Sequence, residues 1–359
     1  MKKLLLSLVI TSSVVVVNAA IAAAVTTTTS VKATTPSSNT NVFIEPQAGE
    51  TPIVNLINAA KQSIAITIYE LDDQNIQNAL NAAANRGVKV QIIYSNRTEA
   101  YETMAKTFCN SNLQISCQRA SGIDDKSTYN VPYGFYVTHE KSLLIDNSIA
   151  VIMTLNMVKN ATYNYFGATR DFGVITNDPA DVASLANQFT SDWANATNNG
   201  SNFPVVDSNT RLFFSPSRVA NPADSYNALA QLINQASKSI DIYAENFSDT
   251  NRNESQNIVK LLNAKAKSGV IVRIIAANSK VADLDPAVQI IQPLAAYPLY
   301  FHAKSIMIDG VVATVMSVNY SNYSINQNRE AGIILSDKAS VSLMEDTFNQ
   351  DWQALHNPQ

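Results

Sequence analysis

The chain has 359 residues, long enough for two domains of ordinary size that each bury a core. Hydrophobic residues make up 46% and charged residues 15% of the sequence, and this composition excludes wholesale disorder. The 25 basic and 29 acidic residues give a net charge of −4, which disfavours a protein that coats nucleic acid, although it allows a local basic pocket for one phosphate.

Residues 1–22 predict a secretory signal peptide. Lys2 and Lys3 precede a long apolar run, which ends in small residues that a signal peptidase accepts. The alternative is an uncleaved anchor, because the apolar run approaches the length of a membrane span. Residues 23–40 are rich in Thr and Ser and predict a flexible tether. We therefore expect an exported protein, periplasmic or secreted if the signal is cleaved and membrane-anchored if it is not.

After the tether, the sequence repeats itself once. The recurring segments are TNVFIEP (40–46) with TRLFFSP (210–216), KQSIAITIYE (61–70) with SKSIDIYAEN (237–246), RGVKVQII (86–93) with SGVIVRII (268–275), HEKSLLID (139–146) with HAKSIMID (302–309), and FTSDW (189–193) with FNQDW (348–352). Their order is preserved, which indicates a duplicated domain and not a solenoid of short repeats. We expect one domain at residues 41–200 and the other at residues 207–359.

The spacing of apolar residues in the first half predicts helix, strand, helix and strand. Apolar residues have helical spacing over 53–60 and 76–84, and Gly87 ends the second helix. Alternating isoleucines over 64–68 predict one strand, and VKVQIIY (88–94) predicts the next. A strand–helix–strand unit of this length predicts a parallel core sheet covered by helices, so each half should be α/β.

The two cysteines, Cys109 and Cys117, lie close together in CNSNLQISC. Export would place them in an oxidising compartment, so we predict a disulfide that closes this short loop. Two free thiols are the alternative if the protein stays in the cytosol. A metal site is not expected there, because no histidine is nearby.

Each octet predicts the first strand of a β-hairpin. Asp146-Asn147 and the matching Asp309-Gly310 are two-residue turn signals between apolar, β-rich segments. A two-residue turn pairs Ile145 with Ser148 in the first hairpin. The same count outward pairs each octet histidine with a hydroxyl residue, His139 with Thr154 and His302 with Ser317.

This register gathers polar side chains on one face of each hairpin, because side chains alternate along a strand. The two sets are His139, Lys141, Thr154 and Asn156, and His302, Lys304, Ser317 and Asn319. Each set offers donors for phosphate oxygens and an imidazole that can attack or move a proton. Two facing sets would supply the nucleophile and the proton donor that displacement at a phosphodiester requires.

The pattern His-x-Lys, four residues, Asp, and then a hydroxyl residue before x-Asn resembles the phospholipase D superfamily, and it occurs twice with the same spacing. The resemblance covers nearly all of the chain after the tether. It implies an α/β fold of two duplicated phospholipase D-like domains, with two mixed sheets flanked by helices and one active site at their interface. It implies no cofactor and no metal. Met153 and Met316 depart from the usual glycine, and we expect them to pack inward.

The resemblance also implies roles for single residues. One histidine would form a covalent phosphohistidine and the other would act as acid and then base; the usual order makes His139 the nucleophile, but the roles could reverse. The phosphate oxygens would be held by Lys141, Lys304, Asn156 and Asn319, with the hydroxyls of Thr154 and Ser317. The family's histidine-orienting carboxylates match Asp171 in TRDFGVI and Glu330 in NREAGII. We expect the turn residues Asp146 and Asp309 to be structural.

The favoured substrate is a glycerophospholipid at a membrane surface, hydrolysed to phosphatidic acid. Transfer of the phosphatidyl group to an alcohol, as in cardiolipin synthesis, is a close variant, and an exported endonuclease of the same superfamily is the alternative. A third possibility is a lipid-binding protein without catalysis. We expect a monomer with pseudo-two-fold symmetry and no protein partner. Tyrosines 133, 136, 297 and 300, just before the octets, are candidates for strand core or for the entrance of the site.

Overall fold

The computed structural model describes residues 40–95, 107–119, 137–160, 163–197, 211–216, 224–248, 257–281, 283–295 and 297–356. The predicted signal peptide and tether lie outside the described residues, except for Thr40, which is already the first residue of a strand. Tyr133 and Tyr136 also lie outside them.

The first half of the chain forms a mixed sheet with the strand order β1-β9-β7-β6-β2-β4-β5. Its strands are β1 (Thr40–Glu45), β2 (Ser63–Ile68), β4 (Lys89–Tyr94), β5 (Ile115–Arg119), β6 (Lys141–Ile145), β7 (Ile149–Met153) and β9 (Thr169–Thr176). Strands β2, β4 and β5 are parallel, as the strand–helix–strand pattern predicted, while β6, β7, β9 and β1 are antiparallel to their neighbours. Two short strands, β3 (Leu71–Asp72) and β8 (Met157–Val158), pair separately.

The second half repeats this order position by position, as β10-β17-β16-β15-β11-β12-β13. Its strands are β10 (Leu212–Ser215), β11 (Ser239–Phe247), β12 (Ile271–Ser279), β13 (Val288–Ile291), β15 (Lys304–Ile308), β16 (Val312–Met316) and β17 (Glu330–Leu335). The equal strand orders confirm the duplicated α/β fold with two mixed sheets. One short strand, β14 (Tyr300–Phe301), leaves its own half and pairs with β9 of the first sheet.

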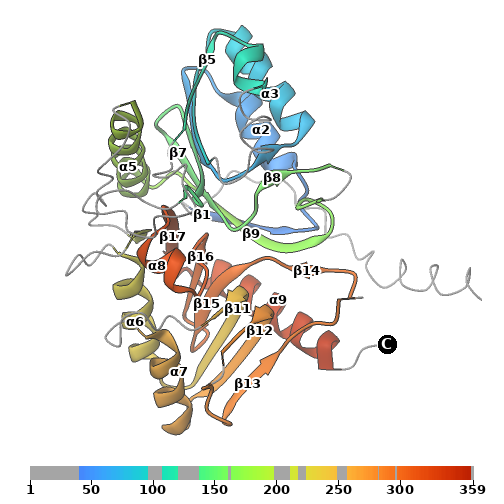
Figure 1. The fold of residues 1–359 in the computed structure, drawn as a ribbon, viewed down its shortest axis with the longest axis vertical. Helices are drawn as coiled ribbons and strands as arrows, with labels where there is room; N and C mark the ends of the chain where they lie inside the picture. The colour runs from blue at the N-terminus through green and yellow to red at the C-terminus, as the bar shows by residue number, and fades with distance from the viewer. Residues whose placement is uncertain are drawn as a thin grey trace, which may run out of the picture. The chain divides into compact units, whose positions relative to one another are not determined.

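Helices cover both sheets (Figure 1). In the first half, α2 (Thr51–Ala59) and α3 (Gln74–Asn85) pack together, and α6 (Ser225–Gln235) and α7 (Ile258–Lys267) do the same in the second. The remaining helices are α5 (Pro179–Thr197), α8 (Asn322–Asn326) and α9 (Lys338–His356). The Asp73 carboxylate caps α3 by accepting from Ile76 N (2.8 Å), and Gly87 follows its end with a φ of 88°, as the sequence predicted.

Three buried clusters of apolar side chains hold these layers together. The first lies between α2, α3 and the first sheet, and the second lies between α6, α7 and the second sheet. The third is shared by both halves and brings Phe172 and Leu185 together with Tyr243, Phe348 and Trp352. The two halves therefore bury a common core, which fixes one against the other.

The first hairpin has the predicted turn but a different strand register. Ser148 N donates to Ile145 O (2.9 Å), and Asp146 and Asn147 have φ values of 52° and 48°, as a type I′ turn requires. However, Ile145 pairs with Ile149 and not with Ser148. Ser148 is thus one extra residue between the strands, a local bulge that the turn signal does not reveal.

The second hairpin has an extra residue at the matching place, Val311, because Ile308 pairs with Val312. The predicted pairings of the two histidines with Thr154 and Ser317 are therefore wrong. Thr154 N instead donates to Phe172 O (2.9 Å), and Ser317 N makes the matching bond to Ala331 O (2.9 Å). Both hydroxyl residues thus lie beside the strands that carry Asp171 and Glu330.

The two motif aspartates hold the hairpin turns against the starts of β2 and β11. Asp146 accepts hydrogen bonds from the backbone N–H groups of residues 61, 62 and 63 at 2.8, 2.7 and 2.9 Å. Asp309 accepts from residues 237, 238 and 239 at 2.8, 2.7 and 2.8 Å. Burial opposes the effect, but these N–H groups lower the pKa of Asp309 to about 2. The contacts are structural and lie at the far end of each hairpin from the histidines.

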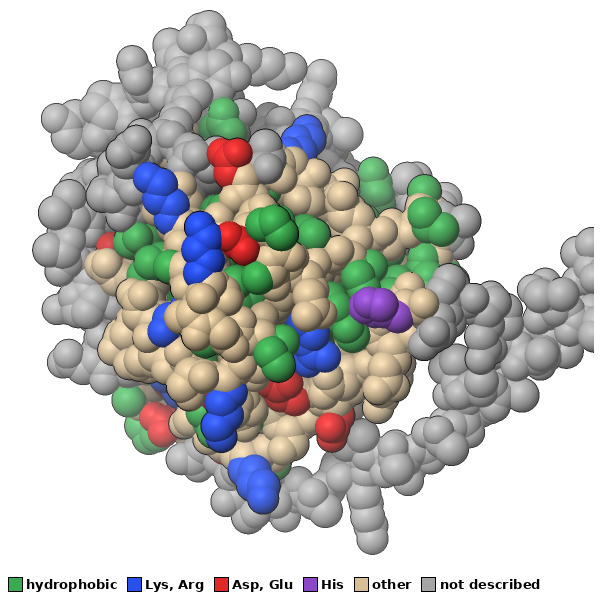
Figure 2. All heavy atoms as spheres, turned by 90° about the horizontal axis from the view of Figure 1, so that it is seen from below, with side chains coloured by type: hydrophobic (Ala, Val, Ile, Leu, Met, Phe, Trp, Pro, Cys, Tyr) green, Lys and Arg blue, Asp and Glu red, His purple; other side chains and the backbone are tan. Residues whose placement is uncertain are grey.

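On the face drawn in Figure 2, the basic side chains of the described residues are interspersed with acidic ones and do not gather into one stripe. Among the helices of the described residues, none is long and apolar enough to cross a membrane.

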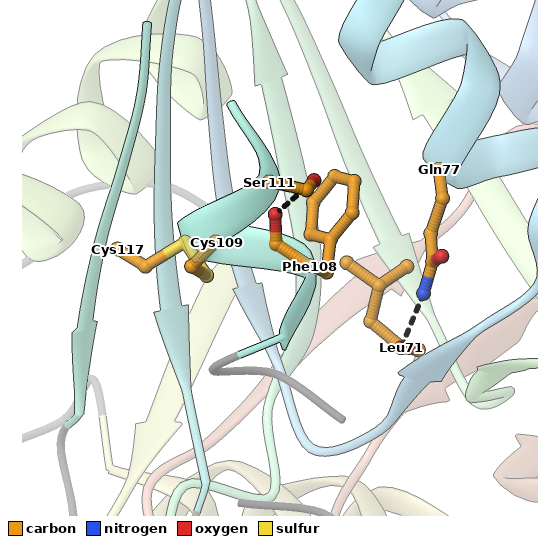
Figure 3. Close-up of a disulfide and its surroundings, with 6 residues drawn as sticks. All are labelled: Leu71, Gln77, Phe108, Cys109, Ser111 and Cys117. Atoms are coloured by element: carbon orange, nitrogen blue, oxygen red, sulfur yellow. Dashed lines mark hydrogen bonds between the residues drawn. A yellow bond between two sulfur atoms is a disulfide. The ribbon is translucent and has the colours of Figure 1, made fainter. Parts of the chain in front are cut away.

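The predicted disulfide between Cys109 and Cys117 is confirmed. Cys109 lies on a helical turn over residues 107–111, Cys117 lies on the edge strand β5, and their Cα atoms are 6.0 Å apart (Figure 3). Ser111 Oγ donates to Phe108 O (2.6 Å) in the same turn, and Phe108 is buried in the core of the first half. The disulfide thus fixes the turn to the edge of the first sheet.

Candidate active site

Two strand contacts bring each octet histidine to the other half of the chain. Thr138 forms a parallel bridge with Arg329, and His139 N donates to Arg329 O (2.9 Å). In the matching contact, β14 runs parallel to the start of β9, and Ala303 N donates to Arg170 O (2.8 Å). The segment before each histidine therefore lies beside the segment before the other half's carboxylate.

As a result, each histidine is bound by the carboxylate of the opposite half. His139 Nδ1 lies 2.8 Å from Glu330 Oε2, and His302 Nδ1 lies 2.8 Å from Asp171 Oδ1. Both carboxylates are fully buried. A carboxylate at Nδ1 fixes the tautomer and leaves Nε2 as the ring nitrogen available for chemistry.

The two octet lysines lie fully buried beside the histidines. Each lysine Nζ donates to the carbonyl oxygen of its octet histidine at 2.5 Å, and Lys304 Nζ also lies 2.9 Å from His302 Nε2. Burial, together with nearby lysine charge, lowers the pKa of His139 to about 4, so its imidazole is neutral at pH 7. Burial likewise lowers the pKa of Lys141 to about 7. The site therefore combines a neutral imidazole with two closely placed, buried lysine side chains.

The hydroxyls of Thr154 and Ser317 contact the buried carboxylates. Thr154 Oγ1 donates to Asp171 Oδ1 (2.5 Å) and accepts from Phe172 N (2.9 Å). Ser317 Oγ accepts from Ala331 N (3.1 Å) and is one of the groups that lower the pKa of Glu330, after the larger effects of burial, which opposes it, and of His139. The structure thus places both hydroxyls beside the carboxylates, and their contact with a bound phosphate stays a prediction.

The two motif asparagines lie close to carboxylates that sequence reasoning missed. Asn156 Nδ2 donates to Glu70 Oε2 (3.3 Å), and Asn319 Nδ2 donates to Glu245 Oε2 (3.2 Å). Glu245 also forms an ion pair with Lys304 at 2.7 Å. Aligning the two repeats places Glu245 opposite Tyr69, and this change from an aromatic to an acidic residue was the signal in the sequence for Glu245.

An aromatic ring also lies against each histidine. The ring of Tyr69 contacts His139 edge-on with centroids 4.9 Å apart, and Tyr165 contacts His302 in the same way at 4.7 Å. Tyr165 comes from the segment between Asn156 and Asp171, which is four residues longer than the matching segment of the second half (15 positions against 11). This insertion explains why no repeat comparison could identify Tyr165.

Buried arginines fix the strands that carry the carboxylates. Arg170, next to Asp171, donates to both carboxylate oxygens of Asp351 (2.7 and 2.9 Å). Arg329, next to Glu330, donates to Asp192 Oδ1 (2.9 Å). The two aspartates belong to the repeated FTSDW and FNQDW segments, so the end of each half binds the carboxylate-bearing strand of the other. Among the described residues, no group of three or more His, Cys, Asp or Glu side chains is arranged to hold a metal ion.

The sheets, the repeated octets and the crossed histidine–carboxylate pairs define a phosphodiesterase-type site of the phospholipase D superfamily. Residues 53–193 and 229–352 match the family described as "Cardiolipin synthase, PLD-like domain", and the chain belongs to this family. Among curated proteins, it is 22% identical over 361 residues to a cardiolipin synthase of Listeria monocytogenes, covering 88% of this chain and 69% of that protein. A cardiolipin synthase of Listeria innocua is 23% identical with the same coverage.

Solved structures show the same fold. Phosphatidylserine synthase of Haemophilus influenzae superposes with a TM-score of 0.63 at 12% identity, covering 89% of this chain and 87% of that one. Polyphosphate kinase of Porphyromonas gingivalis superposes with a TM-score of 0.62 at 14% identity and 86% coverage of this chain. The present chain spans 50% of the length of that kinase.

Proposed function

We propose that the protein is a phospholipase D-type phosphodiesterase that acts on the phosphatidyl group of glycerophospholipids through a phosphohistidine. The observation that carries this proposal is the crossed pair of histidines, His139 with Glu330 and His302 with Asp171. Each Nδ1 is held by a buried carboxylate, so two Nε2 atoms are available for an in-line displacement at phosphorus.

The electrostatics favour His139 as the nucleophile and His302 as the acid. His139 has a lowered pKa and one carboxylate partner, so its Nε2 carries a lone pair at neutral pH. His302 has Asp171 at Nδ1 (2.8 Å), and both Lys304 Nζ (2.9 Å) and Glu245 (3.6 Å) lie near its Nε2. The displacement needs one nucleophile and one proton donor, so His302 is assigned as the acid.

In the first step, His139 Nε2 attacks phosphorus and the bond from phosphorus to the head-group oxygen breaks. His302 Nε2 gives its proton to that oxygen, and the head group leaves as an alcohol. In the second step, water or another alcohol attacks phosphorus and gives its proton to His302, while the P–N bond to His139 breaks. Lys141, Lys304 and the two motif asparagines donate to the nonbridging oxygens in both steps.

A second candidate is transfer of the phosphatidyl group to an alcohol instead of water. The curated relatives are named cardiolipin synthases, and this name favours an alcohol as acceptor. The two outcomes share every step up to the phosphohistidine. They are separated by the products formed with and without phosphatidylglycerol in the vesicles: phosphatidic acid alone means hydrolysis, and cardiolipin means transfer.

The mechanism can be tested with a phosphatidyl ester of p-nitrophenol, whose phenolate leaves without a proton. His302→Ala should still release about one equivalent of p-nitrophenol in a burst and then stop, because the acid is not needed for departure but the base is needed for turnover. His139→Ala should show no burst. A burst in His139→Ala alone would reverse the roles, and turnover by the unmodified protein with no covalent adduct in either variant would refute the mechanism.

The substrate is tested by head-group release from mixed phospholipid vesicles in excess chelator, beside single-stranded DNA. We expect metal-independent lipid turnover. Cleavage of DNA with intact lipid would assign the same chemistry to a nuclease. Lack of reaction with either substrate would favour a binding protein without catalysis.

A further inference from the structure

The two halves of the active site differ in charge at the position that follows the strand pair beside each octet lysine. Ile68 pairs with Lys141 across β2 and β6, and Ala244 pairs with Lys304 across β11 and β15. The next residue along the chain is Tyr69 in the first half and Glu245 in the second. The same backbone position thus carries an aromatic ring on one side of the pseudo-two-fold axis and a carboxylate on the other.

Each of these side chains contacts the histidine and lysine of its own half. The Tyr69 ring packs on His139, and Lys141 Nζ lies 5.2 Å from the centre of the same ring. Glu245 lies 2.7 Å from Lys304 Nζ and 3.6 Å from His302 Nε2. At this position the histidine assigned as nucleophile therefore has a neutral aromatic neighbour, while the one assigned as acid has an anionic neighbour.

Glu245 has a consequence for the charge that a substrate must carry. A phosphate that binds Lys304 competes for the cation that now pairs with Glu245, whose side chain is only 17% exposed. A mostly buried carboxylate that loses part of its charge compensation is unfavourable. A ligand that brings both a phosphate for Lys304 and a cation for Glu245 replaces the broken ion pair completely. A ligand with a phosphate alone does not.

Two tyrosines beside Glu245 and His302 also suit a cation. The hydroxyl of Tyr300 lies 3.5 Å from Glu245 Oε1, and this tyrosine is 43% exposed. The Tyr300 ring lies 6.3 Å from the His302 ring, and the Tyr165 ring lies on the same imidazole. Aromatic faces beside a carboxylate bind ammonium groups by cation–π attraction as well as by charge.

We propose that Glu245 binds the ammonium group of the leaving head group, so that the substrate class is a zwitterionic, amine-bearing glycerophospholipid. This inference rests on the proposed function. In phosphatidylethanolamine, two carbon atoms separate the leaving oxygen from the nitrogen. A head group whose oxygen takes a proton from His302 therefore has its ammonium beside that histidine, on the side where Glu245 lies. A nucleic acid phosphodiester has no such cation next to the leaving oxygen.

The test compares short-chain phosphatidylethanolamine and phosphatidylglycerol with identical acyl chains, used as monomers so that surface charge plays no part. The measured quantity is the ratio of kcat/KM for the two lipids. We expect the unmodified protein to favour phosphatidylethanolamine, and Glu245→Gln to reduce that preference about 30-fold, the low end of the range for loss of one partner of a buried charge pair. Glu70→Gln, which removes the carboxylate beside Asn156, should leave the ratio unchanged.

An equal loss with both lipids in Glu245→Gln would overturn the inference, because it would mean that Glu245 acts only on His302 or on folding. Glu245→Asp, which keeps the charge and shortens the side chain, should retain a preference for the amine-bearing lipid, and loss of that preference would also count against the proposal. If the unmodified protein turns over neither lipid, the proposed function itself fails. If it turns over both without preference, the function stands and the inference falls.

Discussion

The buried carboxyl of Glu45 should make the protein less stable as the pH rises. Glu45 lies fully buried on β1 opposite Asp171, where its Oε2 accepts from Gly49 N (2.8 Å). Burial is the main cause that raises its pKa from 4.5 to about 8, and the charge of Asp171 adds to this. The folded protein thus holds a proton that the unfolded chain releases above about pH 4.5.

The sign and size of the effect follow from these two values. A carboxyl with a raised pKa contributes stability that is fully present below the unfolded pKa, declines as the pH rises, and is gone above the folded pKa. The difference between 4.5 and about 8, at about 1.4 kcal/mol for each tenfold change, corresponds to about 5 kcal/mol. This is an upper figure, because water entry and local rearrangement would lower it.

The measurement is the free energy of unfolding in urea at a series of pH values from about 5 to about 9. Glu45→Gln keeps the shape of the side chain and cannot ionise, so it should flatten the decline and be more stable than the unmodified protein at the alkaline end. Glu140, whose pKa burial raises to about 7, should contribute in the same direction, and the double variant should be flatter still. An equal slope in Glu45→Gln and in the unmodified protein would refute the reasoning.

Two further predictions concern the strands that carry the carboxylates. Asp351→Asn leaves the buried Arg170 guanidinium without its ion-pair partner, so we expect a loss of about 3–5 kcal/mol in unfolding free energy and a lower kcat. A change within error of zero would show that the pair is dispensable. Gly173→Ala places a methyl group onto the Phe43 ring, which packs directly on this glycine, so we expect a loss of about 1–3 kcal/mol. Adding Phe43→Leu should restore part of it, and a failure to do so would point to another cause.

Much of the fold could be predicted because the duplication shows each element twice. The spacing over 53–60 and 76–84 placed two helices, and β2 and β4 lie where alternating or apolar residues predicted strands. The strand register could not be predicted, because the bulge at Ser148 follows a turn that looks complete without it. The residues of a turn indicate its type, but they do not show how many residues separate the turn from the first pair of the two strands.

The motifs named part of the candidate site but not its connections. His139, His302, Asp171 and Glu330 could all be named from the motifs. The exchange of carboxylates between halves depends on two contacts far apart in sequence, which no local pattern specifies. Glu245 was missed for a different reason. The motifs were found from residues that the two repeats share, and the repeats differ at this position.

Because the carboxylates are exchanged between the halves, the second copy of the domain is not redundant. Neither half contains a histidine together with the carboxylate that orients it, because the carboxylate of each half contacts the histidine of the other. Loss of the carboxylate of one half should therefore impair the histidine of the other half, even when that other half is intact. The two halves can diverge around the site, as they do at Tyr69 and Glu245. Neither half can lose the carboxylate that orients the histidine of the other.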